Sequence, residues 1–259
     1  MALIFFDIDG TLWDFKNVIP ESTKTAIRLL KENGHKLFLS SGRTKVFIRS
    51  EELLSMGFDG LCGGCGTEIE YRGEELLYKT IDPKALERAV KMFDDHDMAV
   101  MMESRDVLFL EEDKLSRDDY GKYIVESMRD VTLPVRGNET SGDVCKFTVL
   151  IEGREYREVV EALSDDFEVM VHGEFVIEAA PKGYSKASAI AFLCEHLGAD
   201  RADTYAFGDG ANDIEMLDYA GVGIAMGNAA DVAKEHADYI TDDIHADGLY
   251  NACKHFGLI

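Results

Sequence analysis

The sequence has few basic residues and no long apolar run. Lysine and arginine together number 27, against 50 aspartates and glutamates, which gives a formal net charge of −23 at pH 7. Such a charge argues against sequence-independent binding to nucleic acid or to an anionic lipid surface. No apolar stretch approaches the ~20 residues needed to span a bilayer, and no basic segment precedes an apolar signal core at the N-terminus. We therefore expect no nucleic-acid partner and no membrane partner, with cytoplasmic residence as the default.

Cysteine is also scarce, with five residues dispersed along the chain. An odd, scattered set fits a reduced compartment better than a disulfide framework. The stretch Cys62-Gly63-Gly64-Cys65 has the spacing of a zinc or redox pair, but no second pair or nearby histidine completes a metal site. A thioredoxin-like site would need a different sequence context. We therefore interpret this stretch as a glycine-rich turn.

Apolar runs and helical periodicities alternate in both terminal parts of the 259-residue chain. Short apolar runs indicate buried strands of a parallel sheet, and apolar residues three and four apart indicate amphipathic helices. The predicted strands are 3–6, 36–40, 60–62, 204–207 and 222–225, and the predicted helices are 22–33, 44–56, 185–197, 212–219 and 229–236. This alternation predicts right-handed crossovers and an α/β, doubly wound parallel sheet.

The middle of the chain has a different pattern. Helices are predicted at 84–96 and 156–164, and strand-like segments at 99–110, 144–151, 167–171 and 175–179. In the strand 144–151, Lys146 and Thr148 fall on the face opposite four apolar residues. Two helices over meandering strands predict an α+β domain, residues 83–182, inserted between two parts of the α/β domain, residues 1–82 and 183–259.

Polar motifs lie where predicted strands end or helices begin. Asp7–Thr11 follows the first strand, Ser41–Arg43 the second and Gly208–Asp213 a later one, and Lys186 lies at a helix start. Ligands bind beyond the carboxyl ends of parallel strands, so we expect these groups to converge on one crevice. Carboxylate oxygens without paired histidine or cysteine suit Mg²⁺. A carboxylate can also be a nucleophile, and its neighbour can serve as acid and base.

These motifs resemble those of the haloacid dehalogenase superfamily of phosphatases, and within it the Cof-type hydrolases with a large inserted cap. "DIDGT" matches the first motif of that family and "SSGR" the second, with serine in place of the usual threonine. "KGYSK" matches the third motif and "GDGANDIEML" the fourth, so the similarity covers nearly the whole chain. The resemblance implies a Rossmann-like core with an inserted α+β cap, and a phosphatase activity that uses Mg²⁺.

The resemblance also implies a role for each matching residue. Asp7 would attack the phosphoryl group, and Asp9 would protonate the leaving oxygen and then activate water. Mg²⁺ would be held by Asp7, the backbone carbonyl of Asp9 and Asp209, with support from Asp213. The residues expected to bind phosphate or substrate are Thr11, Ser41, Gly42, Arg43, Lys186 and Asn212.

The leading hypothesis is a phosphatase for small phosphorylated metabolites, with sugar phosphates as the first class to test. A phosphomutase shares the aspartyl nucleophile, but it would isomerise sugar phosphates and release little phosphate. A receiver-like signalling module also pairs acidic residues with a lysine, but it is about half as long and has no inserted cap. Two assignments stay open. Lys182 is an alternative to Lys186 as the lysine of the third motif. Trp13 could contact substrate or pack under the cap.

Overall fold

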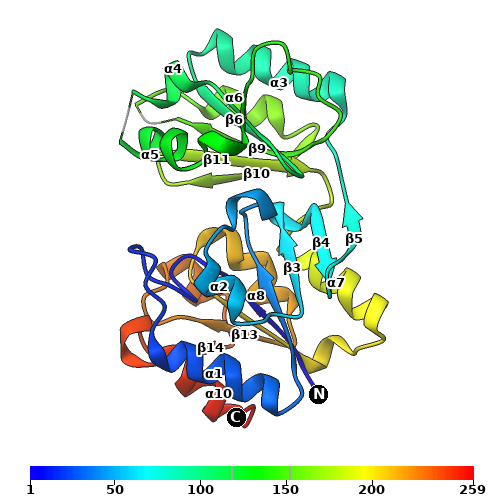
Figure 1. Ribbon diagram of the computed structural model, residues 1–259, viewed down its shortest axis with the longest axis vertical. Coiled ribbons are helices and arrows are strands. Elements are labelled where there is room, and N and C mark those ends of the chain that lie inside the picture. Colours follow the sequence, from blue (N-terminus) through cyan, green and yellow to red (C-terminus); the bar gives the residue numbers. More distant parts are fainter. Residues whose placement is uncertain (118, 152) are drawn as a thin grey trace.

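The structure, a computed structural model, describes residues 1–117, 119–151 and 153–259. Two lobes, each built on one β-sheet, lie one above the other in Figure 1. We call the lobe with the eight-stranded sheet the core lobe and the lobe with the six-stranded sheet the cap lobe. The chain enters the cap lobe after β5 (Glu74–Tyr78) and returns to the core lobe after β11 (Val176–Pro181). The predicted domain boundaries, after residues 82 and 182, stay a prediction.

The core sheet has the strand order β14-β13-β12-β1-β2-β3-β4-β5. The strands not yet bounded are β1 (Leu3–Phe6), β2 (Lys36–Ser40), β3 (Gly60–Gly63), β4 (Glu68–Tyr71), β12 (Thr204–Gly208), β13 (Val222–Ala225) and β14 (Tyr239–Ile240). The six strands from β14 to β3 pair in parallel, which confirms the predicted doubly wound sheet. Two strands that were not predicted, β4 and β5, extend this sheet in antiparallel pairing. Their two-residue turn has positive φ at both Arg72 and Gly73, as a type I′ hairpin turn requires.

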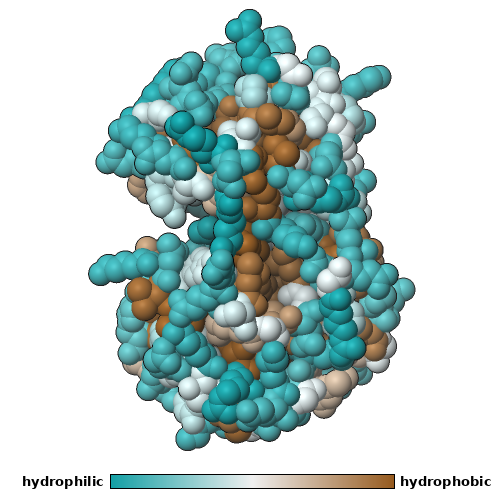
Figure 2. All heavy atoms as spheres, viewed as in Figure 1, coloured by the Kyte–Doolittle hydropathy of each residue, from teal (hydrophilic) through white to brown (hydrophobic). Residues whose placement is uncertain are grey.

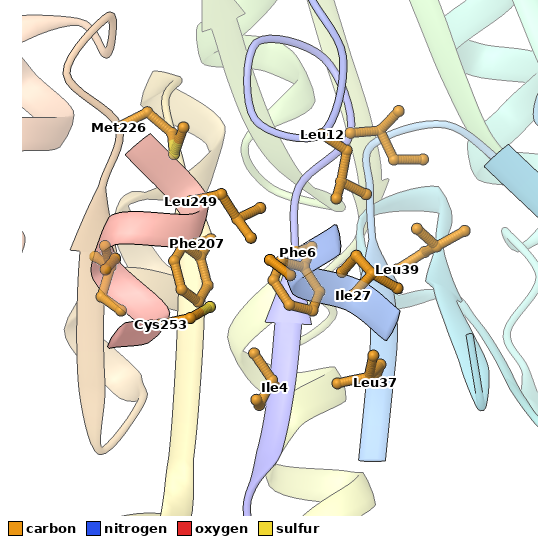
Figure 3. Close-up of a cluster of buried hydrophobic side chains, with 14 of the residues drawn as sticks. Ile4, Phe6, Leu12, Ile27, Leu37, Leu39, Phe207, Met226, Leu249 and Cys253 are labelled. Atoms are coloured by element: carbon orange, nitrogen blue, oxygen red, sulfur yellow. The ribbon is translucent and has the colours of Figure 1, made fainter. Parts of the chain in front are cut away.

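Helices cover both faces of the core sheet. They do so because the buried strands present apolar side chains on both faces. The helices of this lobe are α1 (Glu21–Glu32), α2 (Glu51–Ser55), α7 (Lys186–Leu197), α8 (Ile214–Tyr219), α9 (Asp231–Glu235) and α10 (Gly248–His255). Figure 3 shows Ile4 and Phe6 of β1 beside Leu37 and Phe207 of the neighbouring strands, in the cluster that includes residues of α1 and α10. The intervening residues of β1 belong to a second cluster, with residues of α7 and α8. The central strand β1 is therefore buried on both faces.

The cap sheet has the order β10-β11-β9-β6-β7-β8. Its other strands are β6 (Ala99–Ser104), β7 (Leu108–Leu110), β8 (Thr132–Pro134), β9 (Val144–Leu150) and β10 (Phe167–His172). The helices are α3 (Pro83–Asp95), α4 (Glu112–Leu115), α5 (Asp119–Ser127) and α6 (Arg157–Leu163). One face packs on α3 and α6 through a cluster that includes Phe93, Phe147 and Leu163. Residues of the opposite face line a cavity that the core lobe shares.

The predicted helix 44–56 is wrong over its first half. A short 3₁₀ turn, Lys45–Phe47, precedes α2, because the Ser50 hydroxyl caps a new helix by accepting the N–H of Leu53 at 3.2 Å. Thr44 is extended instead of helical, and its side chain bonds across to the cap lobe. The helix predicted from Asn212 likewise begins as a 3₁₀ turn, and α8 starts at Ile214.

On the face seen in Figure 2, both lobes are largely hydrophilic, and apolar side chains gather in a band that runs from one lobe to the other. Among the described residues, no helix is both long enough and apolar enough to cross a bilayer.

Candidate active site

A cavity of about 380 Å³ lies between the two lobes, where β1, β2 and β12 end. The sequence-predicted residues that line it are Asp7, Asp9, Ser41, Gly42, Arg43, Asp209 and Asn212. Three other predicted residues, Thr11, Lys186 and Asp213, are buried behind this lining. The loops after three parallel strands therefore meet at one place, as the position of the motifs predicts.

Asp7, Asp209 and Asp213 form an acidic cluster, because one carboxylate oxygen of each lies within 4.8 Å of the others. The ammonium group of Lys186 donates to Asp7 Oδ1 at 2.6 Å and to Asp213 Oδ1 at 2.5 Å. Lys182, the competing lysine, is exposed on the preceding turn. Three ionised carboxylates around one ammonium group carry a net charge of −2. A further cation bound beside them would therefore stabilise the cluster.

The excess of negative charge in the cluster also raises pKa values of its carboxyl groups. Burial and the neighbouring Asp213 carboxylate raise the pKa of Asp7 above its ordinary value, against the opposing effect of Lys186. The same causes raise the pKa of Asp209 to about 7. A bound divalent cation would favour the ionised forms and reverse both shifts. The donor set, three carboxylates, fits a hard cation such as Mg²⁺.

Gly10 and Thr11 fit the β1 loop closely against Asp209. Gly10 has a φ of +86°, and a Cβ there would lie 2.2 Å from Asp209 Oδ2. The Thr11 hydroxyl donates to Asp209 Oδ1 at 3.3 Å. The Asn228 side chain fixes the same loop from another side by donating to the Gly10 carbonyl at 2.7 Å. The glycine is thus required by its positive φ and by the space that the carboxylate occupies.

Asp213 also shapes the loop that carries Asp209. Its Oδ2 accepts the backbone N–H groups of Asp209 and Gly210, each at 2.9 Å. The Asp213 carboxylate is fully buried, so these bonds are shielded from water. One carboxylate therefore orders the loop with one oxygen and holds Lys186 with the other.

The Asp9 carboxylate is held by two side chains. Arg43 Nε donates to Asp9 Oδ2 at 2.7 Å, and Arg43 Nη2 donates to Asp9 Oδ1 at 2.9 Å. The indole N–H of Trp13 donates to Asp9 Oδ1 at 2.9 Å, and its ring lies beneath the Arg43 guanidinium. Trp13 is buried, so in this structure it positions Asp9. Arg43 was expected to bind substrate oxygens, and this bidentate ion pair with Asp9 is an additional contact that the sequence did not indicate.

The loop after β2 and the Cys62–Cys65 stretch lie together. Ser41 donates its backbone N–H to the Cys62 carbonyl at 2.9 Å, and Cys65 donates its N–H to the Ser41 carbonyl at 3.2 Å. Both cysteines are buried and unbridged, and burial raises the pKa of both thiols. The stretch therefore acts as a turn that supports Ser41, and its thiols stay protonated.

The cap lobe contributes residues that the sequence analysis did not identify as functional. Lys146, Thr148 and Glu178 line the cavity together with Glu103 and His172. The sequence held a signal for two of them, since Lys146 and Glu178 are charged residues inside largely apolar strands. Their partners come from other strands of the sheet, and no local pattern identifies such pairs.

Comparisons with known proteins identify the family and the fold. A family model described as haloacid dehalogenase-like hydrolase matches residues 4–253. The Bacillus subtilis protein YkrA, named as a candidate phosphatase, is 32% identical over 259 residues, which covers 99% of this chain and 98% of that protein. The B. subtilis 5-amino-6-(5-phospho-D-ribitylamino)uracil phosphatase YcsE is 31% identical over 263 residues, 100% of this chain and 96% of its own length. The solved structure of BT4131, described as a sugar phosphatase of subclass IIB, superposes with a TM-score of 0.89 at 28% identity and covers 100% of both chains.

Proposed function

The chain belongs to the haloacid dehalogenase-like hydrolases and is a phosphatase, and from that premise we propose that it hydrolyses small sugar phosphates through an aspartyl-phosphate on Asp7, with Mg²⁺ bound. The observation that carries the proposal is the buried acidic cluster beside Lys186, at the floor of a cavity large enough for a small metabolite.

Asp7 is the proposed nucleophile because its carboxylate lines the cavity while Lys186 holds one of its oxygens. Attack by Asp7 on phosphorus forms a new P–O bond and breaks the ester bond to the leaving oxygen. The Lys186 ammonium then lies beside the charge that accumulates on the phosphoryl group and the nucleophile. Ser41 and nearby backbone amides bind the phosphoryl oxygens.

Asp9 is the proposed acid and base. Arg43 holds its carboxylate in the structure, and we propose that the oxygens of an incoming phosphate monoester take over the guanidinium. The released Asp9, protonated from solvent, gives its proton to the leaving oxygen. Asp9 then removes a proton from the water that hydrolyses the aspartyl-phosphate.

Mg²⁺ would be held by Asp7, Asp209 and the backbone carbonyl of Asp9, with Asp213 in support. When bound, it would supply positive charge that offsets the net charge of the acidic cluster and of the substrate phosphate. The charge and the oxygen ligands of the cluster support this assignment.

The substrate class is proposed from the relatives and from the cavity together. BT4131 is described as a sugar phosphatase, and YcsE is named for a substrate with a phosphorylated ribityl chain. Both descriptions concern a phosphate ester on a hydroxylated carbon chain. Polar side chains line this cavity on the cap side, which suits such a leaving group.

The test is a panel of phosphorylated sugars, nucleotides and vitamin phosphates, assayed for free phosphate with Mg²⁺ and after chelation. We expect phosphate release from sugar phosphates that is lost on chelation. Isomerised sugar phosphate with little free phosphate would instead identify a phosphomutase. A stable phosphorylated protein without turnover would identify a receiver-like module.

A further inference from the structure

The cap network, Glu103, Lys146, Thr148, His172 and Glu178, is a connected set of side chains on the cap face that lines the cavity. Lys146 is buried between two carboxylates, donating to Glu103 Oε1 at 3.0 Å and to Glu178 Oε1. It also donates to Thr148 Oγ1 at 3.1 Å, and Thr148 donates to Glu103 at 2.9 Å. His172 Nε2 bonds to Glu178 Oε2 at 2.8 Å.

None of these side chains has a role in the proposed mechanism. Apolar residues at the same positions could also have filled this part of the cap lobe. A buried ion pair stabilises a fold weakly at best, because desolvation of the charges offsets their attraction. A network of this kind facing a cavity is therefore better explained by recognition than by stability.

Two contacts place the cap network directly over the β2 loop. The Thr44 hydroxyl donates to Glu103 Oε2 at 2.9 Å. A Cβ on Gly42 would lie 3.0 Å and 3.1 Å from the two Glu178 oxygens, so this glycine leaves room for the carboxylate. A phosphoryl group at Ser41 therefore has its leaving group next to Glu178 and His172.

The cavity wall carries no basic side chain that is free of a carboxylate partner among the residues described for it. The charged cap residues are two carboxylates, one ammonium and one histidine ring, and both basic groups already bond to a carboxylate. On the core side, Arg43 is paired with Asp9. Within the described lining, every basic side chain is thus already engaged by a carboxylate, and a second anionic group on the substrate would meet Glu178.

The charges of Glu178 and Lys146 persist over the ordinary pH range. Burial would raise the pKa of Glu178, but Lys146 and His172 outweigh it and hold the pKa below its usual value. Burial would lower the pKa of Lys146, but Glu103 and Glu178 hold it well above its usual value.

Another part of the cavity wall is apolar. Phe47, Met101, Ile124 and Val176 line it, and Phe15, which is 85% exposed, lies at its edge. A leaving group with hydroxyls on one side and C–H groups on the other would match both parts of the wall.

We propose that the cap network selects an uncharged, polyhydroxylated leaving group, with Glu178 accepting substrate hydroxyls and rejecting a carboxylate or a second phosphate. Each oxygen of the Glu178 carboxylate has one hydrogen-bond partner in the network and can accept a further hydrogen bond. An anionic leaving group would face Glu178 at short range, and such like-charge contacts discriminate strongly against wrong ligands. This inference rests on the proposed function for its site, and it adds the charge class of the substrate and the residue that reads it.

The test compares esters that differ in charge but little in shape, such as the open-chain esters sorbitol 6-phosphate and 6-phosphogluconate, which differ only in a terminal hydroxymethyl group or carboxylate. In the wild-type protein with Mg²⁺, we expect kcat/KM to favour the neutral leaving group by about tenfold or more. Glu178→Gln keeps the side-chain shape but removes the charge, so it should shrink that ratio to within about threefold. Glu174→Gln, the same change at an exposed residue between β10 and β11, is the matched control and should keep the wild-type ratio.

Binding separates this inference from the proposed function. The same pairs are titrated by calorimetry into Asp7→Asn, where turnover is not required, and the neutral ester should again bind more tightly. If the wild-type protein turns over none of these esters, the proposed function is contradicted. The binding measurement then still decides whether the cap network discriminates by charge. Equal or tighter binding of the anionic ester would overturn the inference, whatever the Glu178 variant does.

Discussion

Replacement of Gly10 by alanine tests how closely the β1 loop is fitted to Asp209. The change has two separable effects. A φ of +86° costs a non-glycine residue about 1–2 kcal/mol. In addition, the new Cβ would lie 2.2 Å from Asp209 Oδ2, well inside contact distance, so the carboxylate must move by about 1 Å.

Gly34 provides the matched control. It follows α1 with a φ of +80°, but a Cβ there would meet nothing within 4 Å. Gly34→Ala should therefore show the backbone cost alone, a loss of about 1–2 kcal/mol in the free energy of unfolding, with nearly unchanged activity. Gly10→Ala should lose a similar or larger free energy of unfolding.

The difference between the two variants is expected in catalysis. A displacement of about 1 Å in a catalytic group can cost about 10²-fold in rate, so kcat/KM of Gly10→Ala should fall by about that factor. Urea unfolding gives the free energies, and phosphate release with Mg²⁺ gives the rates. If Gly10→Ala keeps as much activity as Gly34→Ala, then the close approach of Gly10 to Asp209 has no catalytic meaning and the reasoning is refuted.

Two further predictions concern buried charges. Lys186→Met removes the cation between Asp7 and Asp213, so phosphate release should be lost. The free energy of unfolding, measured by urea with Mg²⁺ present, should fall by about 3–5 kcal/mol. A fully active variant would contradict the role of this lysine. Burial raises the pKa of Glu68 from 4.5 to about 7, so its ionisation disfavours the folded state as pH rises through that window. Glu68→Gln should therefore gain about 3 kcal/mol relative to wild type between pH 4.5 and pH 7, and a difference that does not change with pH would contradict it.

The parallel sheet and the position of the site could be predicted from the sequence. Buried strands of a parallel sheet are short apolar runs, and Asp7, Ser41 and Asp209 follow such runs directly. Lys186 could be placed because Ser185 begins a helix as its N-cap, accepting the N–H of Ser188. These features depend on local sequence, which a single chain displays.

The cap network and the Arg43–Asp9 pair could not be predicted. Glu103, Lys146 and Glu178 lie on three strands that are far apart in the chain, and the register of those strands brings them together. The alternation of the strand 144–151 did place Lys146 on the face away from the apolar core, but a charged face is more often solvated than buried. Burial against a second lobe is a tertiary property, and no local periodicity contains it.

The central claim is that Asp7 is phosphorylated during turnover, and acid quenching during the reaction followed by mass measurement tests it most directly. We expect the wild-type protein with a sugar phosphate and Mg²⁺ to gain the mass of one phosphoryl group, located on Asp7. Asp7→Asn should gain none and release no phosphate. Full phosphate release by Asp7→Asn would contradict the covalent mechanism.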